Sequence, residues 1–184
     1  MKTFHKFLTV IIPILSVVIA GHVVSADNKG SVEVPNGLKF SEFAGYEKWE
    51  VISLSQADRL AVILGNQLMI DSYKAGIPGN GKPFPDGAKM AKVHWKPKTN
   101  EEAPGQPKVS GDLDDVDFMV KDSVRFADSG GWGYGAFRYE PAKDSWRPFT
   151  TSDQPPQEND AKCGFACHTI VEKNDYVFSE YSRR

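Results

Sequence analysis

The residues best suited to chemistry lie near the C-terminus, in the stretch CGFACHT at positions 163–169. Cys163 and Cys167 are the only cysteines of the 184-residue chain, and His168 follows directly. Two thiols with an adjacent histidine are typical of covalent haem attachment, in which the histidine reaches the iron. The usual spacing is C-x-x-C-H, whereas this motif has the form C-x-x-x-C-H. Cys167 and His168 keep the usual relation, so the sequence leaves open whether one or two thioether bonds form.

Two other kinds of site can use the same cysteines. A disulfide between Cys163 and Cys167 suits an exported chain, but it does not call for a histidine after the second thiol. A structural zinc site needs four ligands, and this motif supplies three. Haem attachment uses all three residues, with His168 as the ligand of the metal.

The N-terminal 26 residues have the order of a secretory signal peptide. Lys2 and Lys6 precede an apolar run, which ends at the small residues Val24, Ser25 and Ala26. An anchoring helix is the alternative, but the run is shorter than the ~20 residues that span a membrane. Nothing later in the sequence is apolar enough to span. We therefore expect residues 1–26 to be cleaved and the mature protein to be periplasmic or secreted, with no membrane association.

The composition of the remaining chain narrows its class. Cleavage leaves 20 basic against 24 acidic residues, so nucleic acid is not an expected partner. It also leaves two histidines, His94 and His168, around which haem or metal chemistry must be built. We expect residues 27–45, rich in turn formers and charge, to be an irregular lead-in, and residues 46–184 to form one domain.

Several short elements must position these residues. Apolar runs, period-two alternation and turn signals predict strands at 60–64, 88–95, 114–122 and 132–139, a helix at 67–75, and polar loops at 96–111 and 141–160. Strands separated by turns with few helices predict the α+β class with an antiparallel sheet. Alternation places Lys92 and His94 on one face of their strand and sets Asp117 opposite the apolar face of its strand.

Three blocks of the sequence resemble a known family. They are FPDGAKMAK at 84–92, VKDSVRFADSGGWGYGAF at 120–137 and CGFACHTIVEKNDYVF at 163–178. In this order they are similar to the signature blocks of the cytochrome P-460 family, small exported haem proteins of bacteria. The resemblance implies an antiparallel sheet with packing helices, a haem-bearing C-terminal helix, one covalently attached haem c, and a homodimer.

The resemblance also implies roles for single residues. Lys92 matches the lysine that is cross-linked to the haem macrocycle, and Asp117 matches a carboxylate over the open iron site, where glutamate is usual. His168 is then the only protein ligand of the iron. Members of this branch oxidise hydroxylamine, so we expect hydroxylamine or a related small nitrogen species as substrate and a small redox protein as electron acceptor.

Two alternatives stay open. A sister branch, the cytochromes c′-beta, lacks the cross-link and binds nitric oxide without turnover. The third interpretation is an electron carrier whose iron has a sixth ligand, for which His94, Met69, Met90 and Met119 are the candidates.

Overall fold

The computed structural model describes residues 32–152, 154 and 160–184. The predicted signal peptide, residues 1–26, lies outside the described residues. The described part contains a six-stranded sheet in which each strand pairs antiparallel with the next along the chain. The strands are β1 (Glu50–Gln56), β2 (Leu60–Gly65), β3 (Lys89–Thr99), β4 (Lys108–Lys121), β5 (Trp132–Glu140) and β6 (Ser145–Pro148). The sheet confirms the predicted α+β class.

The helices are short. The α-helices are α1 (Gln67–Lys74) and α2 (Ala161–His168). The 3-10 helices are η2 (Phe40–Phe43), η3 (Tyr46–Lys48), η4 (Ala127–Ser129), η5 (Pro141–Lys143) and η6 (Thr169–Asn174). Helix α1 begins where the side chain of Asn66 accepts a hydrogen bond from the Met69 amide, which satisfies one of the open donors of the first turn. Within the described ranges, no helix has the length and apolar character needed to cross a membrane.

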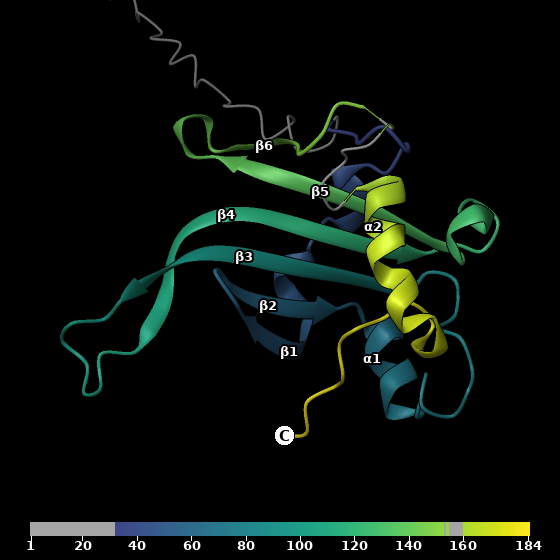
Figure 1. Cartoon of the computed structure of the whole chain (residues 1–184), viewed down its shortest axis with the longest axis horizontal. Coiled ribbons are helices and arrows are strands. Elements are labelled where there is room, and N and C mark those ends of the chain that lie inside the picture. Colours follow the sequence, from purple (N-terminus) through teal and green to yellow (C-terminus); the bar gives the residue numbers. More distant parts are fainter. Residues whose placement is uncertain (1–31, 153, 155–159) are drawn as a thin grey trace, which may run out of the picture.

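Two predicted loops turn out to be partly strand. The loop expected at 96–111 was wrong at both ends, because β3 continues to Thr99 and β4 begins at Lys108. These ends form an arm that projects beyond the other strands (Figure 1). The arm is polar because it lies outside the core, so its strands lack the apolar alternation by which we recognise a strand. The loop expected at 141–160 likewise contains β6, whose Trp146 is buried opposite Tyr139.

One face of the sheet packs against the chain that precedes β1. This segment lies behind the sheet in Figure 1 and supplies buried apolar side chains to a core with β3, β4 and β5. The ring of Phe43 stacks on that of Phe118, with 4.0 Å between centroids. The expected lead-in, residues 27–45, therefore contributes to the core over its described part, from residue 32 on. Burial of each such side chain contributes roughly 1.5–3 kcal/mol.

The opposite face of the sheet carries α1, α2 and the C-terminal residues, with α2 in front of the strands in Figure 1. Side chains of Met90, Met119 and Tyr134 point to this side. The polar residues that alternate with the aromatic core in β3 and β4 therefore face α2, and several of them are buried there. The sequence predicted the apolar face of β4 but did not predict that its polar face is covered as well.

Candidate functional site

Helix α2 carries both thiols and the histidine of the motif. Cys163 and Cys167 are four residues apart in one α-helix, so their side chains leave the same face, and neither forms a disulfide. Asp160, fully buried at the start of the helix, accepts hydrogen bonds from the Ala136 amide of β5 and, at 2.8 Å, from the Thr150 hydroxyl. The extra residue of the motif is thus accommodated in a regular helix anchored on β5.

The His168 ring is held by three neighbours. Its Nδ1 lies 2.5 Å from the backbone oxygen of Tyr176, and its centroid lies 4.9 Å from that of Tyr134 and 4.8 Å from that of Phe178. Because a carbonyl only accepts, Nδ1 carries the proton and Nε2 keeps its lone pair for a metal. Burial lowers the pKa of His168, against the raising effect of the Tyr176 hydrogen bond, so the imidazole is neutral at pH 7.

A cavity of about 610 Å³ opens between α2, the C-terminal residues and the sheet. Its size falls within the range of small-molecule and cofactor sites. Helix α2 lines it with Cys167 and His168, and the sheet lines it with Met90, Lys92, Asp117 and Met119. The structure therefore brings four of the five predicted site residues to one cavity. The fifth, Cys163, lies on the same face of α2 but does not line the cavity.

Lys92 and Asp117 form the charged part of the sheet wall. They are direct partners in the β3–β4 register. Burial raises the pKa of Asp117 to about 6, although the nearby charges of His94 and Lys92 act to lower it and that of Asp115 adds to the rise. The carboxylate therefore changes its protonation state near neutral pH, as a group that exchanges protons with a substrate needs to do.

His94 is one row further along the same strand face and has a different environment. It is 3 % exposed, and its Nδ1 lies 2.5 Å from Asp115 and 3.8 Å from Asp117. Asp115 also pairs with Arg59. His94 is not among the residues that line the cavity, so its position favours a histidine hydrogen-bonded to Asp115 over a sixth iron ligand.

Of the methionine candidates for a sixth ligand, Met90 and Met119 line the cavity, whereas Met69 is a fully buried residue of α1 and does not line it.

Other residues of the site were not among the five predicted site residues. Tyr134 and Phe178 enclose the histidine ring, and the Tyr176 carbonyl orients it. The sequence signal that could have identified them is their position within the blocks GWGYGAF and NDYVF. The Tyr134 hydroxyl is buried and makes no hydrogen bond to any described residue, so it can donate to a bound molecule.

This donor set fits a haem. It offers one neutral imidazole with Nε2 available, an adjacent thiol, apolar walls and a buried hydroxyl beside a cavity. A single axial histidine supported by a carbonyl on its Nδ1 is a common mode of haem ligation.

Comparison with models of protein families finds a match over most of the chain. The family model described as Cytochrome P460 matches residues 43–179, which include all five predicted site residues. No curated protein matches the chain. The matched range begins in η2 and ends after the Phe178 ring that packs on His168, so it spans the whole sheet and both walls of the cavity.

Proposed function

Because the chain belongs to the cytochrome P460 family, and is therefore a haem-carrying cytochrome, we propose that it holds one haem covalently and oxidises hydroxylamine or a related small nitrogen species. The observation that carries this proposal is the pairing of Lys92 with Asp117 on the wall of the cavity that His168 also lines. A catalyst needs a proton acceptor beside the bound substrate, whereas a simple electron carrier does not.

The proposed attachment uses α2. His168 would ligate the iron through Nε2, and Cys167, which lines the cavity beside it, would form a thioether bond by addition of its S–H bond across a haem vinyl group, with no external oxidant. Cys163 leaves the same helix face one turn earlier and is the candidate for a second thioether bond.

We also propose that Lys92 Nζ is joined to the macrocycle. Such a bond replaces one N–H and one C–H bond, so two protons and two electrons leave to an external oxidant such as a peroxide. Lys92 lies on the cavity wall, where its amine can reach a bound macrocycle, whereas Lys89 points to the opposite face of the sheet and contacts Glu42.

In the proposed mechanism the haem supplies the iron that binds the substrate nitrogen and accepts its electrons. The chain's own residues do the rest. Asp117, with its pKa raised to about 6 by burial, accepts protons from the substrate as the electrons leave. The lining side chains of Met90 and Met119 exclude bulk water around it. Tyr176 keeps the imidazole of His168 in the ligating tautomer.

Hydroxylamine turnover of the purified holoprotein with an artificial electron acceptor tests this function. We expect turnover by the wild type and its loss in Asp117→Asn, which keeps the shape of the side chain but cannot accept the proton. A wild type that binds haem and shows no turnover contradicts the proposed activity.

A second candidate is nitric oxide binding without turnover. The apolar part of the cavity wall favours a small uncharged ligand. It includes Ile63, Met90, Met119, Val177 and Phe178. Ferric and ferrous absorption spectra separate the candidates. A ferrous Soret band far to the red indicates the lysine cross-link, that of ordinary high-spin haem c favours nitric oxide binding, and a low-spin spectrum indicates a sixth ligand such as Met90 or Met119.

We further propose that the protein acts after export, as a homodimer, with a small redox protein as electron acceptor. Export is supported by the signal-peptide pattern of residues 1–26. The dimer and the redox partner are supported by membership of the family.

A further inference from the structure

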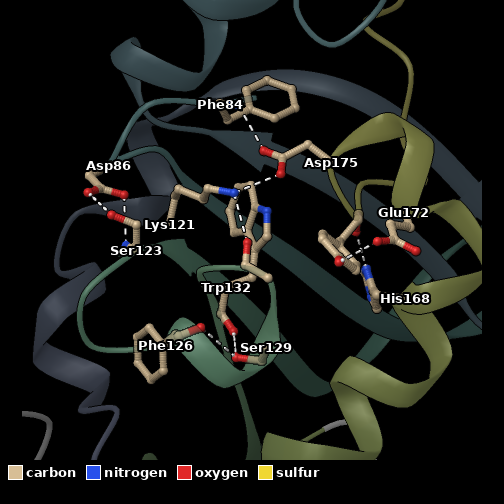
Figure 2. Close-up of polar contacts among 12 residues, drawn as sticks. Phe84, Asp86, Lys121, Ser123, Phe126, Ser129, Trp132, His168, Glu172 and Asp175 are labelled. Atoms are coloured by element: carbon tan, nitrogen blue, oxygen red, sulfur yellow. Dashed lines mark hydrogen bonds and ion pairs between the residues drawn. The ribbon is translucent and has the colours of Figure 1, made fainter. Parts of the chain in front are cut away.

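A buried ion pair lies behind the histidine ligand. Lys121, at the end of β4, and Asp175, just after η6, are 7 % and 11 % exposed, and Lys121 Nζ lies 2.7 Å from Asp175 Oδ1. The same ammonium donates to the Gly130 carbonyl at 2.9 Å and lies 5.2 Å from the ring centroid of Trp132, its cross-strand partner. Figure 2 shows the amine beside the Trp132 ring and joined to Asp175 by a dashed line. A lysine with so many partners is fixed in one position.

Asp175 connects this lysine to other parts of the chain. Its second oxygen accepts a hydrogen bond from the Phe84 amide at 2.8 Å, so one carboxylate joins β4 to the loop before β3 (Figure 2). Asp175 and Tyr176 have φ of 51° and 63°, in the left-handed region that non-glycine residues seldom adopt. Two such residues in succession persist only where surrounding contacts hold them.

This backbone conformation places the Tyr176 carbonyl against His168, the proposed haem ligand. Tyr176 follows Asp175 directly, and its backbone oxygen lies 2.5 Å from His168 Nδ1. A hydrogen bond from Nδ1 to a carbonyl fixes the ring and raises the basicity of the ligating nitrogen. Moving the Asp175 backbone therefore moves the acceptor on which the electronic character of His168 depends.

We propose that Lys121 is a positioning residue for the haem: through its ion pair with Asp175 it holds the Tyr176 carbonyl on His168 and thereby sets the strength of the iron–histidine bond. Lys121 and the cavity occupy different parts of the sheet face, and Lys121 does not line the cavity. Its effect on the iron is transmitted through Asp175 and Tyr176. The inference rests on the proposed function in one respect, the ligation of iron by His168.

The test uses three variants of the holoprotein. Lys121→Met removes the charge and keeps the length of the side chain, and Asp175→Asn removes the charge and keeps an oxygen for the Phe84 amide. Lys89→Met is the matched control, because Lys89 also donates to a backbone carbonyl, at 2.6 Å, and also lies over an aromatic ring, at 5.5 Å, but on the opposite face of the sheet.

The readouts are the iron–histidine stretching frequency of the ferrous protein by resonance Raman spectroscopy and the midpoint potential of the haem. We expect Lys121→Met and Asp175→Asn to lower the frequency and raise the potential, because a less basic histidine stabilises ferric iron less. Lys89→Met is expected to leave both unchanged. If Lys121→Met does not fold, Asp175→Asn decides.

Two results separate failure of this inference from failure of the proposed function. Wild-type frequency and potential in a folded, haem-loaded Asp175→Asn variant overturn the positioning role alone. A wild-type signal that survives in His168→Ala shows that His168 is not the ligand, which overturns the haem ligation on which both proposals rest.

Discussion

Lys92 and Asp117 lie directly opposite each other on neighbouring strands, and both side chains line the cavity that His168 enters from the other side. The relation follows from the register of the β3–β4 hairpin, in which a shift by one residue would turn either side chain into the aromatic core. Asp117 also lies within the electrostatic reach of Lys92, whose charge acts to lower the carboxyl pKa.

The proposed cross-link predicts a spectral difference between two lysine variants. Lys92→Ala should lose the red-shifted ferrous Soret band, because no amine remains at the cavity wall, whereas Lys89→Ala should keep it. The check is the ferrous spectrum together with mass analysis of a proteolytic digest, in which a wild-type haem peptide contains both Lys92 and Cys167. A red-shifted band in Lys92→Ala would assign the shift to another residue.

The raised pKa of Asp117 predicts how turnover depends on pH. A base acts in its ionised form, and burial raises the pKa of Asp117 to about 6, so turnover should rise with pH through about 6 and then level off. Asp117→Asn should lose ~10²- to 10⁴-fold in turnover and lose this limb of the profile. Asp112→Asn, at an exposed position of the same strand, is the control. An unchanged profile in Asp117→Asn would remove Asp117 from the mechanism.

The lowered pKa of Asp115 predicts that this residue makes a pH-dependent contribution to the free energy of unfolding. Burial raises its pKa, but the hydrogen bonds and charges of His94 and Arg59 outweigh burial and hold the pKa below its usual value. A lowered carboxyl pKa contributes stability above the unfolded-state value and loses it as the pH falls through the folded-state value. Asp115→Ala should therefore reduce the free energy of unfolding at pH 7 by about 1–3 kcal/mol, since the buried His94 ring loses its hydrogen-bond partner and the partly exposed Arg59 loses an anion.

Urea unfolding followed by circular dichroism measures this effect. Asp114→Ala is the control, because among the described side chains Asp114 forms an ion pair only with Arg59, at 3.3 Å. This substitution should reduce the free energy of unfolding by ~1 kcal/mol or less. The difference between wild type and Asp115→Ala should shrink toward pH 3. A difference that persists unchanged at acid pH would show that packing, and not charge, is responsible.

The close contact between Gly130 and Tyr176 predicts that a change in this turn affects His168, the proposed haem ligand. Its φ is 66°, and a Cβ at this position would overlap the Tyr176 ring. Gly130→Ala should therefore destabilise the fold by about 1–3 kcal/mol and reduce haem occupancy, because the ring displaces the carbonyl that holds His168. Gly105→Ala has a similar φ of 77° with open space around it, so it measures the backbone strain alone. Equal losses in the two variants would exclude the contact with Tyr176 as a cause.

The two cysteines predict different attachment phenotypes. Cys167 lines the cavity and Cys163 does not, so Cys163→Ala should retain the added mass of one haem, whereas Cys167→Ala should lose it or retain only a small fraction. Intact mass spectrometry of the mature protein is the measurement. Complete loss of haem in Cys163→Ala would show that the first thiol is the essential one.

Much of the fold and site follows from local sequence patterns. The strand at 60–64, which corresponds to β2, was predicted, and so were helix α1, the apolar face of β4 and the α+β class, because each is encoded by periodicity over a short window. The polar hairpin arm and β6 were not, since their pairing is decided by partners distant in the sequence. Lys121 and Asp175 illustrate the same limit: an ion pair that joins positions 54 residues apart has no local signal.

The Tyr176 carbonyl comes eight residues after the histidine it holds. The consequence concerns maturation. The groups of α2 that we propose to bond haem lie between positions 163 and 168, so thioether formation would require only a short stretch of chain. Orientation of His168 requires the folded end of β4, the loop at Phe84 and the turn at Gly130. If the proposed ligation is right, attachment and tuning are separate events, and the second depends on the folded sheet.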